Sequence, residues 1–153
     1  MAVAMVAARR VAAQQEEKLQ SAFLADLTIE IEPRHDTGAR TGGRFVIPVA
    51  GGTIEGPRLK GTLVRPSGDW MIERPDGSRV LDVRLLVQTD DDQFVYLSWR
   101  GVAYTPTNGA VVARIAPVFE TGAPKYTWLN NVIAVGVLRP SQGRFVYRLY
   151  EIL

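Results

Sequence analysis

The chain has 153 residues with 18 basic and 16 acidic side chains, a length that fits one domain built around one hydrophobic core. Apolar residues make up 46% and charged residues 22% of the sequence, which excludes a disordered chain, and no apolar run approaches the roughly 20 residues of a membrane span. The basic residues are spread along the chain rather than clustered, so we expect neither a nucleic-acid partner nor a membrane partner.

The N-terminal segment, residues 1–23, is rich in alanine, glutamine and glutamate and contains no glycine or proline. These composition features predict an α-helix. The charges follow the short apolar start, and Glu16 and Glu17 lie among them, which argues against a secretory or transit signal. We expect a helix over residues 1–23, with its first turns frayed or in contact with a neighbouring subunit, and a folded domain over residues 24–153.

After this segment the sequence changes to short apolar stretches separated by turn residues. Leu27, Ile29 and Ile31 alternate with polar neighbours until Pro33 ends the pattern, which is typical of a half-buried strand. The strands expected in chain order are residues 24–33, 44–52, 58–66, 67–74, 79–88, 93–104, 111–119, 127–138 and 144–152.

The connections between these strands are short. Residues 89–92 join the clearest hairpin, and Asn108 followed by Gly109 is a strong hairpin signal. An antiparallel sheet with this many strands around one core tends to close on itself, because closure removes its edges. The sequence therefore predicts an all-β fold, a single closed antiparallel β-barrel of about nine strands with an N-terminal α-helix.

Small barrels are either filled by side chains or hold one ligand, and strand alternation bears on which side chains point inward. The mainly apolar faces of three strands are Leu81, Val83, Leu85 and Val87; Val95, Leu97 and Trp99; and Val111, Ala113 and Ile115. In one interpretation the opposite, more polar faces lie in water. In the other they line a polar pocket, in a barrel covered outside by the N-terminal helix or a partner subunit. The alternation alone favours the first interpretation.

Five stretches carry a family resemblance: "PVAGGTIEGPRLKGTL", "GDWMIERPDG", "LDVR", "APVFETGAPKYTWLN" and "VGVLR", in this order. From about residue 25 to its C-terminus, the chain resembles small bacterial and fungal proteins known as domain of unknown function 3237. The resemblance implies a closed antiparallel β-barrel of one domain and assigns no general activity. Such proteins usually carry an aromatic pair at the position of Val111 to Ile115, so a less aromatic pocket wall is expected here.

Several kinds of site are excluded by residue type. The absence of cysteine excludes disulfides, thiolate metal ligands and a cysteine nucleophile, and it is compatible with the cytoplasmic location that we expect. The single histidine, His35, lies in a charged turn with no nucleophile nearby, so neither a catalytic triad nor a multi-histidine metal site is expected. The glycines of residues 50–56 lack a phosphate-loop pattern and indicate close backbone approach or a bulge.

Acid–base chemistry is the remaining catalytic option, because burial can raise the pKa of a carboxyl group toward neutrality. Asp82 and Glu120 are the candidate acid–base residues. Asp82 shares a strand face with Arg84, so a structural ion pair is the alternative. Glu120 precedes the turn residues Gly122 and Pro124, where it could instead accept backbone N–H groups and fix a corner.

The working hypothesis is a barrel that binds a small aromatic or apolar anionic metabolite. The ligand-binding candidates are Arg84, Arg114, Trp70, Tyr96, Trp128 and Asn130. The reaction expected of an enzyme is a cofactor-free proton transfer, elimination or cyclisation, that is, a lyase, isomerase or cyclase with no metal. The alternatives are a non-catalytic ligand carrier and an oligomeric structural module with a filled barrel. A homodimer or higher homo-oligomer is also expected.

Overall fold

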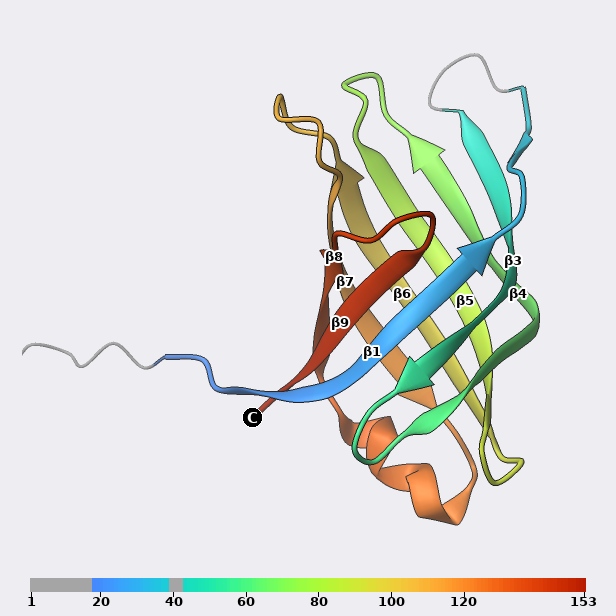
Figure 1. The fold of residues 1–153 in the computed structure, drawn as a ribbon, viewed down its shortest axis with the longest axis vertical. Coiled ribbons are helices and arrows are strands. Elements are labelled where there is room, and N and C mark those ends of the chain that lie inside the picture. Colours follow the sequence, from blue (N-terminus) through green and yellow to red (C-terminus); the bar gives the residue numbers. More distant parts are fainter. Residues whose placement is uncertain (1–17, 39–42) are drawn as a thin grey trace, which may run out of the picture.

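The computed structural model describes residues 18–38 and 43–153. Within them the chain forms nine strands and one 3₁₀ helix (Figure 1). The strands are β1 (Ser21–Ile31), β2 (His35–Asp36), β3 (Arg44–Glu55), β4 (Lys60–Glu73), β5 (Arg79–Thr89), β6 (Phe94–Tyr104), β7 (Val112–Glu120), β8 (Ala134–Arg139) and β9 (Phe145–Ile152), and the 3₁₀ helix η1 is Pro124–Asn131.

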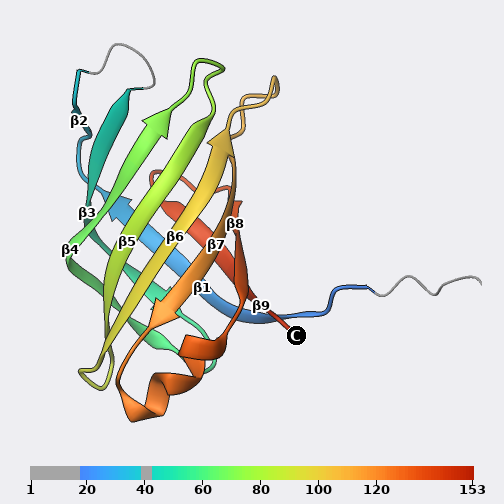
Figure 2. The same cartoon turned by 180° about the vertical axis from the view of Figure 1, so that it is seen from behind.

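All neighbouring strands are antiparallel, and the sheet closes into a barrel. The strand order is β1-β9-β8-β7-β6-β5-β4-β3, and β1 pairs with β3 to complete the ring. The two-residue β2 adds to β3 beyond the end of β1, through His35 opposite Val46 and Asp36 opposite Phe45. The predicted closed barrel is thus confirmed, with eight strands in the ring and one short extra strand (Figures 1 and 2).

The glycine-rich stretch lies where β3 crosses β1 to close the barrel. Gly52 has a φ of +146°, and a Cβ atom at this position would lie 2.0 Å from the carbonyl oxygen of Thr28. No other residue type allows the two backbones to approach this closely. The structure confirms the prediction of close backbone approach, and β3 runs through the stretch to Glu55 rather than ending at residue 52.

The strands predicted at residues 58–66 and 67–74 are one strand, β4, with a bulge between Val64 and Gly68. The Ser67 hydroxyl spans this bulge, because it donates to the carbonyl of Val64 at 2.6 Å and accepts the N–H of Leu86 at 3.0 Å. These two hydrogen bonds keep the chain within the sheet where Pro66 interrupts the backbone donors. The apparent break in the sequence pattern is therefore a bulge.

The interior is mostly apolar, as the alternation favoured. Leu85, Val87, Val95 and Leu97 are buried, whereas the intervening polar side chains of β5 and β6 point out of the barrel. The largest of the fully buried side chains lie between mid-barrel and one end: Phe119, Leu27, Ile54, Leu59, Leu85, Leu97, Leu129, Leu149, Val87 and Val95. This part of the barrel is filled.

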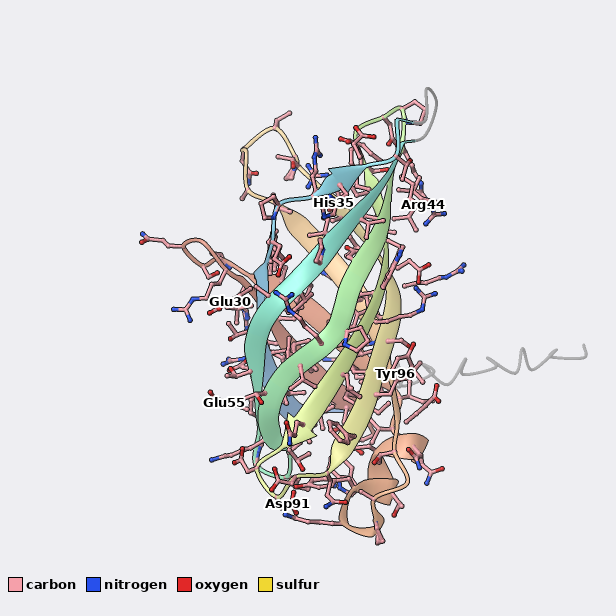
Figure 3. All side chains as sticks on the ribbon, turned by 90° about the vertical axis from the view of Figure 1, so that its right-hand side faces the viewer. Glu30, His35, Arg44, Glu55, Asp91 and Tyr96 are labelled. Carbon is pink, nitrogen blue, oxygen red and sulfur yellow. The ribbon has the colours of Figure 1, made fainter. Side chains whose placement is uncertain are left out.

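The helix η1 closes the filled end, which we call the capped end; it comprises η1 and the turns at 56–59 and 90–93. Figure 1 shows η1 lying across this end of the barrel. Tyr126 and Leu129 of η1 are buried. The Tyr126 hydroxyl donates to Asp91 at 2.6 Å, and Asp91 also accepts from Thr89 and Lys125 at 2.7 Å. Figure 3 shows Asp91 at this end, opposite His35 and Arg44.

The strand predicted over residues 127–138 is therefore wrong in its first half. Pro124 stands at the start of η1 and fixes a backbone angle suited to a helical turn. The burial of Tyr126 and Leu129 in the end of the barrel then favours a helical turn, and β8 begins only at Ala134. Tertiary packing therefore overrides the local strand propensity of this segment.

The helix predicted over residues 1–23 falls largely outside the described residues. Inside them, Ser21 to Phe23 belong to β1, where Ser21 pairs with Ile152 and Phe23 with Tyr150 of β9. β1 therefore begins three residues before the predicted domain boundary, because the last residues of β9 pair with Ser21 to Phe23. Among the described residues, no helix is long and apolar enough to cross a membrane.

Candidate functional site

A cavity of about 280 Å³ lies inside the barrel at the end opposite η1. We call this the open end; it comprises residues 32–38 and the turns at 74–78, 105–111 and 140–144. The cavity wall is mostly apolar and is formed by Ile29, Ile31, Arg34, Ile47, Val49, Asp69, Met71, Arg79, Leu81, Val83, Trp99, Ala103, Val111, Ala113, Leu138, Phe145 and Tyr147. The barrel is therefore not filled throughout, and the size of the cavity suits a small ligand.

Asp69 is the carboxylate in the cavity wall, and the register of β4 points it inward. It lies opposite Val83 of β5 and Ile47 of β3, both of which also line the cavity. Its Oδ1 accepts the backbone N–H of Asp82 at 3.0 Å. Oδ2 accepts no hydrogen bond from the described residues, so this oxygen is available to a ligand.

Burial raises the pKa of Asp69 to about 6. The hydrogen bond from the Asp82 N–H lowers the pKa in part, and the nearby Asp82 carboxylate raises it. The group is hence present in both protonation states near neutral pH. A carboxyl group in this condition can donate and accept a proton at the same operating pH.

Trp99 and Tyr147 form an aromatic pair in the same wall, with ring centroids 5.9 Å apart and planes tilted by 57°. Both side chains are buried. Burial raises the pKa of Tyr147, and the charge of Asp69 raises it further, so the phenol stays protonated and can donate a hydrogen bond. The Trp99 Nε1 is buried without an acceptor among the described residues. A buried N–H without a partner costs about 1–3 kcal/mol, which an acceptor on a ligand could offset.

Two arginines and an apolar rim surround the cavity at the open end. Arg34 and Arg79 both line it, and the Arg34 guanidinium lies 4.2 Å from the centroid of the Phe45 ring. Ile31, Val111 and Phe145 line the cavity as well, yet they are 45%, 41% and 40% exposed. Large apolar side chains exposed at a cavity mouth are suited to the entry of an apolar molecule.

The structure places the predicted charge partners outside the barrel. Asp82 and Arg84 lie on the outer face of β5, where they form an ion pair of 3.3 Å, the structural alternative considered above. Arg114 lies on the outer face of β7 and donates to the carbonyl of Ala113 at 2.9 Å. Trp70 also points outward, and the Arg84 guanidinium lies 5.2 Å from its ring centroid. None of these four side chains lines the interior cavity.

The other predicted residues are divided between the outer wall and the capped end. Tyr96 and Glu120 lie opposite each other on β6 and β7, and both line open depressions on the outer surface. Trp128 packs under the Arg58 guanidinium, 3.7 Å from its ring centroid. Asn130 bonds both backbone groups of Thr121 at 2.9 Å, so Asn130 rather than Glu120 fixes this corner.

Metal-binding side chains are not gathered anywhere in the described part of the chain, where no three of His, Asp and Glu lie close enough to hold an ion. His35 is exposed, as predicted, although it lies in β2 rather than in a loop. The polar groups in the cavity wall are carboxyl, phenol, indole and guanidinium groups.

A family model described as "Protein of unknown function (DUF3237)" matches residues 18–152. The chain belongs to the DUF3237 family. A UPF0311 protein of Rhodopseudomonas palustris is 29% identical over 126 residues, covering 74% of this chain and 82% of that protein. A β-barrel-like protein of Acinetobacter baumannii, known from a crystal structure, superposes with a TM-score of 0.82 at 29% identity, over 92% of this chain and 99% of its own.

A fungal protein is also similar to this DUF3237 chain. The hydroalkoxylation enzyme phnH of Penicillium herquei is 35% identical over 89 residues, which cover 58% of this chain and 52% of the enzyme. Its name attaches a reaction to one protein similar to this one. The family description itself assigns no activity.

Proposed function

We propose that the barrel binds a small, largely aromatic or apolar molecule in its interior cavity and that Asp69 transfers protons on it. The observation that carries the proposal is the Asp69 carboxyl group, which lines an otherwise mainly apolar cavity and whose pKa is raised to about 6. We thus assign to Asp69 the acid–base role for which Asp82 was a candidate from the sequence; Asp82 itself lies on the outer face.

The wall supplies the parts that a proton-transfer reaction without a cofactor requires. The protonated carboxyl of Asp69 donates its proton to one atom of the ligand, and the resulting carboxylate accepts a proton from another. The net reaction is an isomerisation, addition or cyclisation within the ligand, and the carboxyl is restored. The Tyr147 hydroxyl and the Trp99 N–H are the donors that could stabilise negative charge on a ligand oxygen.

The fungal relative supports this class of chemistry. Hydroalkoxylation adds an O–H bond across a carbon–carbon double bond, so one carbon gains a proton and the oxygen loses one. A single carboxyl group that acts first as acid and then as base can perform both transfers. The match to that enzyme spans 52% of its length, and its reaction is extended to this chain as part of the proposal.

The test uses a panel of ortho-alkenylphenols, beginning with 2-allylphenol, whose cyclisation to 2-methyl-2,3-dihydrobenzofuran leaves the molecular formula unchanged. We expect the wild-type protein to catalyse ring closure of at least one member, and Asp69→Asn to lower kcat by about 100-fold or more. Glu120→Gln, on the outer wall, is the control and should stay close to wild type. Asp82→Asn removes a charge that contributes to the raised pKa of Asp69, so it should change kcat far less than Asp69→Asn does.

Three outcomes would contradict the proposal, the first two by removing Asp69 from the reaction and the third by removing the reaction itself. If Asp69→Asn retained turnover, Asp69 would not be the acid–base group. If Asp82→Asn or Glu120→Gln lost turnover while Asp69→Asn did not, the site would lie on the outer wall. If the panel bound in the cavity without any turnover, the protein would be a ligand carrier. The predicted homo-oligomer and cytoplasmic location stay predictions.

A further inference from the structure

We propose that Arg34 and Arg79 together hold an anionic group of the ligand at the mouth of the cavity, so that the preferred ligand is a monoanionic aromatic molecule. This inference rests on the proposed function and adds the substrate class and two specificity-determining residues. The sequence predicted an anionic ligand with Arg84 and Arg114 as its charge partners. Both lie on the outer face of the barrel, and the present proposal assigns that role to Arg34 and Arg79 instead.

Among the described residues, Arg34 and Arg79 are the arginines that line the cavity, and neither has the carboxylate partner that some other arginines of the barrel have. Five others have a carboxylate partner: Arg58 with Glu151, Arg65 with Glu32, Arg84 with Asp82, Arg144 with Glu30, and Arg148 with Asp26. Within residues 18–38 and 43–153, neither Arg34 nor Arg79 has a carboxylate within 4.0 Å. Each of the two nevertheless lines the cavity. An anionic group on a ligand would supply the missing partner.

Arg34 is also held in place by its neighbours. Its guanidinium stacks on the ring of Phe45, a buried residue of β3, at 4.2 Å from the ring centroid. A guanidinium fixed on an aromatic face loses less freedom when it binds a planar anion. Arg79 approaches from the start of β5, so the two charges reach the same cavity from different segments of the open end.

The position of the arginines relative to Asp69 suggests the size of the ligand. Asp69 lies opposite Val83, and Arg79 lies four residues earlier on β5. At about 3.3 Å per residue, the backbone of Arg79 is roughly 13 Å along the strand from that of Val83, which marks the position of Asp69. Because an arginine side chain is long, one or two fused aromatic rings can span the remaining distance. The anion then lies at the mouth and the reacting atoms beside Asp69.

The experiment compares two ligands of the same shape and different charge, 2-naphthoate and 2-naphthamide, by calorimetry at pH 7 and moderate salt. We expect the wild-type protein to bind the naphthoate about fivefold or more tightly than the amide, the size of a partly exposed charge pair. Arg34→Gln and Arg79→Gln should each reduce this ratio toward one by weakening naphthoate binding, with little change for the amide. Arg34→Lys and Arg79→Lys should retain part of it.

Control variants separate failure of this inference from failure of the proposed function. Arg84→Gln and Arg114→Gln remove charge from the outer wall and should keep the wild-type ratio. Asp69→Asn should keep or increase it, because a negative group leaves the cavity. Equal binding of both ligands, or a ratio that depends on Arg84 or Arg114, would overturn the arginine assignment and leave the cavity intact. If neither 2-naphthoate nor 2-naphthamide bound, both proposals would be overturned.

Discussion

The same strands build a solid capped end and a hollow open end, and the contrast is clearest on the β6–β7 pair. Toward the capped end Leu97 lies opposite Phe119, and toward the open end Ala103 lies opposite Ala113. All four point inward, but the first pair fills the barrel and the second leaves space in the cavity wall. The difference shows that a cavity in a small barrel can be made by a few small inward residues, without any change of topology.

Apolar side chains at the two ends should therefore tolerate truncation very differently. Leu129→Ala removes a fully buried side chain of η1, and we expect it to lower the free energy of unfolding by about 2–5 kcal/mol. Val111→Ala, at the exposed rim of the cavity, should cost less than about 1 kcal/mol. Urea denaturation of both variants measures the contrast, and similar losses would show that the ends are equally well packed.

Asp69 should destabilise the fold while it serves the site. Because its folded-state pKa is raised from 3.8 to about 6, the folded state binds the proton more tightly than the unfolded state. Stability is then highest below pH 4 for this group and falls as the pH rises toward 6. Asp69→Asn should be more stable than wild type at pH 8, by about 3 kcal/mol at most, with the difference vanishing near pH 4.

Denaturation curves of the two proteins at several pH values test this sign directly. The asparagine retains an oxygen that can accept the Asp82 N–H, so loss of that hydrogen bond does not obscure the comparison. A wild-type protein more stable than Asp69→Asn at pH 8 would mean that a favourable partner holds the charged carboxylate.

Substitutions that enlarge an inward side chain should also distinguish the two ends, with a smaller difference in stability. Ala113→Leu places a larger side chain in the cavity wall, so it should change stability by less than about 1 kcal/mol and should block binding of 2-naphthamide. Ala25→Leu makes the same change at a fully buried position of β1 and should cost about 1–3 kcal/mol. Equal costs at the two positions would argue against the hollow end.

The smallest effect concerns the hydrogen bonds of the cap. The hydrogen bonds from Lys125 and then from Tyr126 hold the pKa of Asp91 below its usual range, so their contribution is present above about pH 4 and is lost as the pH falls further. Tyr126→Phe should lower the melting temperature at pH 7, though less than Leu129→Ala does. The difference from wild type should shrink in acid, and a difference independent of pH would exclude Asp91 as the partner.

Much of the fold follows from the sequence, because alternation along β5, β6 and β7 is regular and turn residues mark the hairpins. The candidate site does not follow in the same way. Around residue 70 the apolar Trp70 and Ile72 alternate with Asp69 and Met71, and hydrophobicity alone would place the tryptophan inside. The pairing of Asp69 with Val83, after the bulge at Pro66, sets the opposite face. Met71 on the same face as Asp69 was the available signal.

Two other features could not be predicted from the local sequence, because they too depend on tertiary contacts. The helical turn of η1 depends on the space at the end of the barrel, which Tyr126 and Leu129 fill. The outward direction of Trp70 is stabilised by Arg84 from the neighbouring strand. Each depends on contacts between residues distant in sequence, whereas the glycine-rich closure and the exposure of His35 follow from the residues themselves.

The most direct test is the titration of the Asp69 carboxyl carbon by ¹³C NMR, assigned with Asp69→Asn and repeated with saturating 2-naphthoate. We expect the Asp69 carboxyl to titrate with a pKa of about 6 in the free protein, and this pKa to rise further when the anion binds nearby. An Asp69 that titrates near 4 and does not respond to the ligand would contradict the assignment of the open-end cavity as an acid–base site.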